Sequence, residues 1–191
     1  MLLSVQGSPR SVFFTKGIRN MHYSCLHIMK KLFVDKYLDP NKKLRILEVG
    51  SMDMSKPRKD LIFRRYFRDN PNWEFIGLDL EKGRNVDVVS KYPYKYPFPD
   101  NSFDVVISGN VLEHVEDLHR IVKEIARITK DLVCIIVPNT RAYHAKPIDC
   151  WRIFPDGMRF LLEEVAELEA LECRVAGNEK VDTIGIARKR K

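Results

Sequence analysis

The chain has 191 residues, of which 45% are hydrophobic and 31% charged, a composition that excludes a disordered or fibrous protein. It is long enough for one domain with a hydrophobic core. Its 33 basic and 26 acidic residues give a formal net charge of +7, but the basic residues are scattered, so nucleic acid is an admissible partner and not the favoured one.

The four cysteines are too far apart for a C-x-x-C motif, which leaves zinc-ribbon and redox motifs unsupported. We expect reduced thiols in a cytoplasmic protein. The apolar run at the amino terminus is too short for a signal peptide, and no stretch of the sequence is long enough to cross a membrane. The sequence does not fix the oligomeric state, and a homodimer stays open.

Residues 1–43 are predicted to form an extension that contains one helix. Apolar residues recur at helical spacing from about Gly17 to Leu38, and Asp39-Pro40 ends the pattern. The β-prone run Leu44–Val49 follows and stops at Gly50, which predicts a buried strand that leads into a tight turn.

Residues 44–137 alternate between β-prone and helical patterns. After the first strand, Pro57 suits the first turn of a helix whose apolar face extends to Phe67. Further elements are predicted in chain order as strands at Trp73–Leu80, Val86–Val89 and Phe103–Ser108, a helix at Leu118–Ile128 and a strand at Leu132–Val137. Alternating strands and helices predict a mostly parallel sheet with right-handed crossovers.

Residues 138–191 begin with a long loop, Asn139–Phe154, and continue with a helix from Pro155 to Leu168. Two closing strands, Leu171–Val175 and Asp182–Ala187, are joined by a short connection, which predicts an antiparallel last strand. The whole chain is therefore predicted to be a single α/β domain, a Rossmann-like three-layer αβα sandwich around a mostly parallel seven-stranded sheet.

The turn after the first strand indicates which ligand this edge of the sheet binds. A dinucleotide carries a pyrophosphate, which needs the glycines of a G-x-G-x-x-G turn, but here only Gly50 is present. Glu48 and Asp53 would repel a pyrophosphate and attract a cation. S-adenosylmethionine has no phosphate and carries an ammonium group and a sulfonium. We therefore predict S-adenosylmethionine as the cofactor.

A further carboxylate, Asp79, lies near the end of the predicted strand Trp73–Leu80. Because parallel strands end at one edge of a sheet, Asp79 is placed to accept both ribose hydroxyls of an adenosyl ligand. Structural roles are the alternatives: Asp79 could cap a helix, and Glu48 could be the buried partner of a backbone amide or a lysine.

Three segments of the central region resemble one family. They are ILEVGS at Ile46–Ser51, FIGLDLEKGRNVDVV at Phe75–Val89, and FPDNSFDVVISGNVLEHVEDLHRIVKEIARI at Phe98–Ile128. In this order they resemble a class I S-adenosylmethionine-dependent methyltransferase of the type 11 kind over most of residues 44–137. The later stretch Tyr143–Leu162 is similar to a sub-group often linked to polysaccharide and sugar biosynthesis.

The resemblance implies roles for the residues at the strand ends. Glu48 and Gly50 would lie along the methionine end of the cofactor, in a turn that also contains Ser51 and Asp53. The chain departs from the family here, because Ser51 replaces the usual second glycine of this turn.

The same resemblance places the rest of the cofactor. Asp79 would hold the ribose, and Leu80 would pack on the adenine. Ser108, Gly109 and Asn110, at the end of the fourth strand, would line the floor beneath the sulfonium.

Two further departures concern the segments before strands four and five. The usual acidic residue near the adenine amino group is absent, and Val89-Ser90-Lys91-Tyr92 lies there instead. Either Tyr92 or Tyr94 could stack on the base, or both could belong to a packed loop. The usual glycine pair before the fifth strand is replaced by Thr129-Lys130-Asp131.

Methyl transfer to a hydroxyl requires alignment of the acceptor and removal of a proton, which a histidine can accept near neutral pH. His144 is the first candidate base, since it lies in the long loop after the fifth strand. Asp149 could orient it and Trp151 could stack on a sugar, or this loop could only lock the last helix. His114 is a second candidate. No metal-ligand spacing is visible, so the chemistry is predicted to be metal-independent.

The acceptor is predicted only by class. After the fourth strand the sequence reads Ser108-Gly109-Asn110-Val111, without the Asn/Asp-Pro-Pro-aromatic run that base N-methylation uses. A small-molecule or glycan hydroxyl is therefore favoured. An RNA methyltransferase, a non-catalytic adenosyl-binding subunit of a partner, and an NAD-linked reductase are the alternatives.

Overall fold

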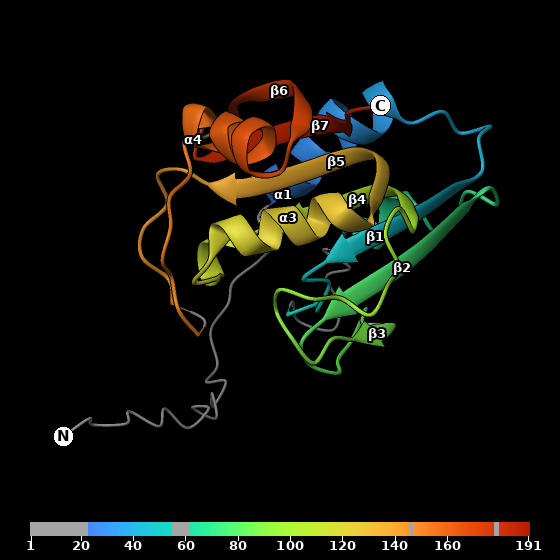
Figure 1. Cartoon of the computed structure of the whole chain (residues 1–191), viewed down its shortest axis with the longest axis horizontal. Coiled ribbons are helices and arrows are strands. Elements are labelled where there is room, and N and C mark those ends of the chain that lie inside the picture. Colours follow the sequence, from blue (N-terminus) through green and yellow to red (C-terminus); the bar gives the residue numbers. More distant parts are fainter. Residues whose placement is uncertain (1–22, 55–61, 146, 178–179) are drawn as a thin grey trace.

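The computed structural model describes residues 23–54, 62–145, 147–177 and 180–191. Within these residues the chain forms a seven-stranded sheet in the order β3-β2-β1-β4-β5-β7-β6 (Figure 1). The strands are β1 (Leu44–Val49), β2 (Trp73–Asp79), β3 (Val88–Val89), β4 (Phe103–Gly109), β5 (Thr129–Pro138), β6 (Leu168–Ala176) and β7 (Asp182–Lys189). Strands β1 to β5 pair in parallel, whereas β7 is antiparallel to both of its neighbours. The predicted α/β class and antiparallel last strand are confirmed.

Short helical segments connect the strands. They are α1 (Tyr23–Ile28), η1 (Met29–Val34), α2 (Asp35–Tyr37), η2 (Phe63–Tyr66), η3 (Leu112–His114), α3 (Leu118–Ile128), α4 (Pro155–Phe160) and η4 (Leu161–Val165). The first three follow one another without a break, and η1 is a π-helical turn. Within the described residues no helix is long and apolar enough to span a bilayer.

Apolar side chains cover the two faces of the sheet and give the molecule three layers. One face packs against α3, α4 and η4 through residues such as Ile121, Ile125 and Leu162. The other face packs against α1 and η1 through residues such as Met29 and Phe33. In Figure 1, α3 lies in front of the sheet and α1 behind it. This is the αβα sandwich that the sequence predicts.

Several predicted boundaries differ from the structure. The first helix is described only from Tyr23, since residues 1–22 lie outside the described part, as do residues 55–61 of the predicted second helix. The described remainder of that helix, η2, is a 3₁₀ turn. The last helix ends at Val165 and not at Leu168, because Glu167 takes a left-handed φ of 57° and turns the chain into β6.

The parallel strands end together at one edge of the sheet. Val49 at the end of β1 is level with Leu78 of β2 and with Ser108 of β4. Gly109 of β4 is in turn level with Ile136 of β5. The turns that follow these strands therefore lie side by side, and they include most of the residues singled out from the sequence.

Candidate functional site

The turn after β1 depends on Gly50. Its φ of +75° is one that side-chain-bearing residues rarely adopt, and a Cβ built there would lie 2.1 Å from Cγ2 of Val111. The backbone N–H groups of Gly50 and Ser51 both donate to the carbonyl oxygen of Leu78, over 2.9 and 3.0 Å. The absence of a side chain at Gly50 thus lets the ends of β1, β2 and β4 meet.

Asn85, in the loop between β2 and β3, holds this turn in place. With a left-handed φ of 71°, its side-chain amide nitrogen donates to the carbonyl oxygen of Ser51 at 2.7 Å and to Oε2 of Glu48 at 3.1 Å. The hydroxyl of Ser51 donates to the carbonyl oxygen of Asn85 at 3.1 Å. Asn85 was not singled out from the sequence. Its one signal is the turn Lys82-Gly83-Arg84-Asn85, where asparagine tolerates a left-handed φ.

Glu48 is buried beneath the turn, with 1% of the residue exposed. Burial raises the pKa of its carboxyl to about 8, and the hydrogen bond from Asn85 opposes this rise only in part. The partner of this carboxyl is therefore a side-chain amide, whereas the structural alternative named from the sequence was a backbone amide or a lysine. A nearby cation would favour the ionised carboxylate, because opposite charges attract strongly in a buried site.

Asp79 ends β2 and turns its carboxylate toward the same turn. One oxygen accepts from the backbone N–H of Met52 at 2.9 Å, and the other accepts from the N–H of Leu80 at 2.7 Å. Each carboxylate oxygen can accept a second hydrogen bond, so Asp79 keeps capacity for two hydroxyls. Leu80 is 49% exposed beside it.

Asp53 is held differently from the other two acids. Its carboxylate is almost fully buried and forms an ion pair with Arg84 at 2.5 Å, and its backbone N–H donates to the carbonyl oxygen of Arg84 at 2.9 Å. Asp53 therefore ties the β1 turn to the loop after β2.

The end of β4 forms the floor between these turns. The Ser108 hydroxyl donates to the carbonyl oxygen of Val49 at 3.2 Å. A Cβ on Gly109 would lie 2.5 Å from the ring of Phe63, so only glycine fits beneath that ring. Asn110 has a left-handed φ of 56°, and among the described residues its buried Oδ1 has no hydrogen-bond donor. Such a buried acceptor is costly unless a ligand N–H or a water meets it.

The aromatic loop before β4 contains the two candidate stacking residues. Tyr94 packs against the guanidinium of Arg120 at 4.6 Å, and its hydroxyl accepts from the backbone N–H of Asp117 at 3.1 Å. Tyr92 is exposed. Tyr94 is thus part of a packed loop, and Tyr92 is the one of the two with a free face.

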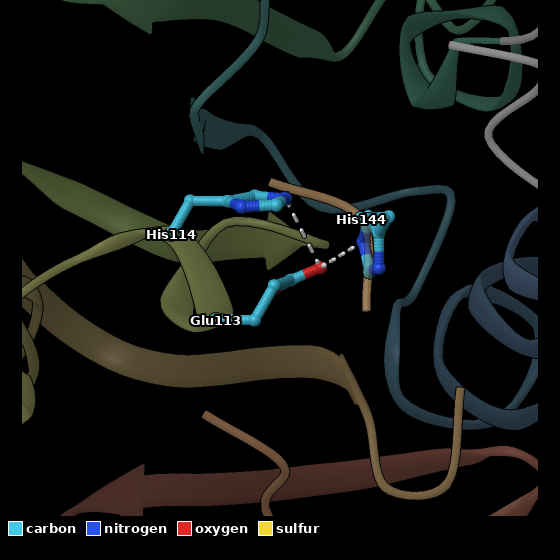
Figure 2. A group of neighbouring side chains, drawn as sticks. All are labelled: Glu113, His114 and His144. Carbon is cyan, nitrogen blue, oxygen red and sulfur yellow. Dashed lines mark ion pairs between the residues drawn. The ribbon is translucent and has the colours of Figure 1, made fainter. Parts of the chain in front are cut away.

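A second group of polar side chains lies directly beyond Asn110. The short helix η3 carries Glu113 and His114, and the long loop after β5 brings His144 beside them (Figure 2). Nε2 of His114 lies 3.6 Å from Oε1 of Glu113, and Nε2 of His144 lies 3.9 Å from the same oxygen. The two imidazole rings meet edge to face, with centroids 5.2 Å apart. We call these three residues the Glu–His–His cluster.

Asp149 and Arg152 fix the loop that carries His144. The two carboxylate oxygens of Asp149 accept from the guanidinium of Arg152 at 2.6 and 2.7 Å, and one of them also accepts from the backbone N–H of His144 at 2.6 Å. The hydrogen bonds from Arg152 hold the pKa of Asp149 near 2 against the opposing effect of burial. Asp149 therefore positions His144 chiefly through the backbone N–H of His144. The ring nitrogen Nδ1 of His144 lies 3.4 Å from the same carboxylate oxygen.

The structure thus brings His144, His114 and Asp149 together, as one loop site beside the β4 floor. Glu113 was not selected from the sequence, because its contact with His144 depends on the path of the loop. The carboxylate of Glu113 raises the pKa of His144 above its ordinary value, against the lowering effect of burial. A raised pKa makes the imidazole a stronger base.

A family model described as a methyltransferase domain, of the type 11 kind, matches residues 47–136. This range contains the β1 turn, Asp79, the β4 floor and the first two residues of the Glu–His–His cluster. Over this range the chain has the core of a class I S-adenosylmethionine-dependent methyltransferase.

One curated relative of this methyltransferase is the demethylmenaquinone methyltransferase of Chlorobaculum tepidum. The two are 25% identical over 160 residues, which cover 72% of this chain and 66% of the relative. The chain therefore spans just under two thirds of that protein's length.

Solved structures share the fold. A SAM-dependent methyltransferase from Aquifex aeolicus superposes with a TM-score of 0.60 at 15% identity, covering 86% of this chain and 93% of that one. The 1,6-didemethyltoxoflavin-N1-methyltransferase of Burkholderia thailandensis, solved with 1,6-didemethyltoxoflavin and S-adenosylhomocysteine, gives 0.63 at 15% identity, covering 87% and 79%.

The residues at the sheet edge fit the cofactor of this family, S-adenosylmethionine. Asn110 offers a buried acceptor that has no donor among the described residues, and Glu48 offers a buried carboxyl that a cation would ionise. Both suit the ammonium group and the sulfonium of S-adenosylmethionine, and neither suits a pyrophosphate. Asp79 supplies the remaining acceptors, which suit a ribose.

Proposed function

We propose that this methyltransferase transfers a methyl group to a hydroxyl of a small molecule or glycan. The observation that carries the proposal is the position of the Glu–His–His cluster, which begins three residues after the floor residue Asn110. A hydroxyl acceptor must lose a proton, and this cluster provides imidazole nitrogens next to a buried carboxylate. No such group is needed for an acceptor that is already nucleophilic.

Each proposed role rests on a contact of the chain itself. Glu48 and Asn110 would bind the methionine end of the cofactor, and Asp79 would bind the ribose through its free acceptor capacity. When bound, S-adenosylmethionine supplies an electrophilic methyl group. His144 would accept the proton of the acceptor at Nε2, while Asp149 and Arg152 keep its loop in place.

Exposed aromatic rings on the loop that carries His144 support a flat or sugar-like acceptor. Tyr143 is 77% exposed, and Trp151 and Phe154 are also exposed on the same loop. The indole N–H of Trp151 donates to the carbonyl oxygen of Val115, which holds the ring in one orientation. Rigid aromatic faces are suited to stacking on a sugar or a ring system.

The comparisons favour a small acceptor. The curated relative is named for demethylmenaquinone, and the Burkholderia enzyme was solved with 1,6-didemethyltoxoflavin. Both names refer to small molecules. The similarity of Tyr143–Leu162 to a sub-group linked to polysaccharide biosynthesis adds glycans to this class by resemblance alone.

The test is a turnover assay on the purified chain. The protein is incubated with S-adenosylmethionine and separate panels of free and nucleotide-linked sugars, phenols and quinols, and RNA. We expect release of S-adenosylhomocysteine together with an O-methylated sugar or small molecule. Methylation of RNA alone would reassign the acceptor, and tight cofactor binding without turnover on any panel would favour the role of a non-catalytic subunit.

A further inference from the structure

We infer that the Glu–His–His cluster, made of Glu113, His114 and His144, is a binding site for one divalent transition-metal ion, with Zn²⁺ as the ion best matched to its ligands. The chain would hold the ion by one carboxylate oxygen and two imidazole nitrogens, as catalytic zinc sites with open positions do. This departs from the metal-independent chemistry that the sequence predicts.

The ligand atoms already converge. Each of the three residues offers one ligand atom, and these atoms all lie within 4.8 Å of one another. The two measured nitrogen-to-oxygen distances are 3.6 and 3.9 Å. Ligand atoms about 2.0–2.1 Å from a tetrahedral zinc ion are about 3.3–3.4 Å from one another. These two nitrogen-to-oxygen distances would therefore have to shorten by only a few tenths of an ångström. Figure 2 shows both rings directed at the Glu113 carboxylate.

The far nitrogen of each ring is held by backbone oxygens. Nδ1 of His114 lies 2.6 Å from the carbonyl oxygen of Ile148, and Nδ1 of His144 lies 3.0 Å from that of Ala142. These acceptors favour the tautomer with the proton on Nδ1, which leaves a lone pair on Nε2. An imidazole whose other N–H donates to a backbone carbonyl is the usual arrangement of a metal-bound histidine.

The environment of the Glu113 carboxylate independently indicates a bound cation. Only 1% of the residue is exposed, yet within the described residues neither carboxylate oxygen has a hydrogen-bond partner. Its backbone is fixed, since its carbonyl oxygen accepts from the N–H of Cys150 at 2.7 Å. A buried carboxylate without hydrogen bonds is costly, and a bound cation would compensate that cost.

The surrounding charges leave the cluster available for a cation. Arg152 has one guanidinium nitrogen 3.4 Å from Nδ1 of His144, but the charge of Arg152 is balanced by its bidentate pair with Asp149. Two imidazoles and one carboxylate favour Zn²⁺ and related transition metals over Mg²⁺ or Ca²⁺, which prefer oxygen ligands. The His144 side chain is 37% exposed, so the site is open to solvent on that side.

The inference deepens the proposed function, and it rests on that function only for what the ion would do. A metal ion here would act as a Lewis acid toward a coordinated hydroxyl oxygen of the acceptor, so that the hydroxyl releases its proton to solvent water as the oxygen takes the methyl group. His144 would then be a ligand and a positioning residue for the ion and not the base. Metal binding itself requires neither cofactor nor acceptor, so it can be tested alone.

The experiment is a calorimetric titration of the full chain with Zn²⁺ after treatment with a chelator, under reducing conditions. We expect one tight equivalent. Glu113→Gln and His144→Ala should each weaken this binding by at least about tenfold, because even the loss of a group that only orients a metal ligand costs about 10–100-fold in affinity. His119→Ala is the matched control, because His119 is an exposed histidine on the nearby helix α3, and it should leave the affinity unchanged.

A second readout uses Co²⁺, whose visible absorption reports the ligand geometry of the site. A spectrum that both cluster variants abolish and His119→Ala retains would support the site. Zn²⁺ binding that is equal in wild type, Glu113→Gln and His144→Ala would overturn the inference, provided that thermal unfolding shows the variants folded. Tight Zn²⁺ binding by a chain that ignores S-adenosylmethionine would sink the proposed function and leave the metal site standing.

Discussion

Asn85 donates its side-chain amide to the buried carboxyl of Glu48 over 3.1 Å, and the same amide nitrogen donates to the carbonyl oxygen of Ser51. A residue of the β2–β3 loop therefore holds both the acid of β1 and the turn that follows it. The sheet edge proposed to hold the methionine end of the cofactor is thus assembled from two loops. Beneath it lies a buried carboxyl whose burial the hydrogen bond from Asn85 offsets only in part.

Glu48→Gln should change how stability depends on pH. The pKa of Glu48 in the folded protein, about 8, is above its ordinary 4.5. The contribution of Glu48 to the free energy of unfolding is therefore fully present below pH 4.5 and is lost as the pH rises toward 8. Without cofactor, wild type should lose on the order of 1 kcal/mol per pH unit in this window, and Glu48→Gln should not. Urea unfolding at several pH values measures the difference. Glu164→Gln, an exposed carboxyl, is the control, and parallel curves for wild type and Glu48→Gln would refute the raised pKa.

Asp79→Ala should weaken the binding of S-adenosylhomocysteine. Loss of hydrogen bonds to a charged group costs roughly 1.5–3 kcal/mol, or about ten- to a hundredfold in Kd. Calorimetry measures the change, and Glu81→Ala, an exposed acid of the same loop, should leave Kd unaltered. An unaltered Kd in Asp79→Ala would remove its ribose role.

Gly50→Ala should destabilise the fold and the cofactor site together. The left-handed φ of +75° and the 2.1 Å approach to Val111 would each cost free energy, roughly 2–4 kcal/mol in total. The double variant with Val111→Ala should recover only the part due to crowding. In Gly157→Ala, the new methyl group would meet only Ile153 at an ordinary 3.7 Å, so stability should be kept. Equal unfolding midpoints for Gly50→Ala and Gly157→Ala would contradict this account.

His144→Ala should separate binding from turnover. As the proposed base or metal ligand beyond the cofactor, His144 should contribute about 10²–10⁴ to turnover and nothing to the affinity for S-adenosylhomocysteine. Steady-state kinetics on the methylated acceptor and calorimetry give the two numbers, with His119→Ala as the exposed control. A variant that keeps full turnover would show that no proton acceptor is needed at this position.

The strand ends could be predicted from the sequence. β1, β2, β4 and β5 are short apolar runs, and a parallel sheet requires that they end at one edge, so the positions of Gly50 and Asp79 follow from pattern alone. The helix α3 was predicted with its observed bounds because its apolar residues keep a clear helical period.

Contacts made by loops could not be predicted in this way. Asn85 reaches Glu48 through a left-handed backbone that the sequence only permits, and Glu113 meets His144 through a loop whose path is set by the pair of Asp149 with Arg152. Leu168 continues the apolar spacing of the last helix, so only the backbone of Glu167 reveals that a strand starts there.

The place of β7 has a consequence for how the chain is made. β7 follows β6 in sequence but lies between β6 and β5, with its register running from Leu132 opposite Arg188 to Pro138 opposite Asp182. While the polypeptide leaves the ribosome, β5 therefore keeps an open backbone edge and β6 has nothing to pair with until Asp182–Lys189 is synthesised. Exposed strand edges promote aggregation. A nascent chain arrested before Asp182 should accordingly depend on chaperones far more than one that extends past Lys189.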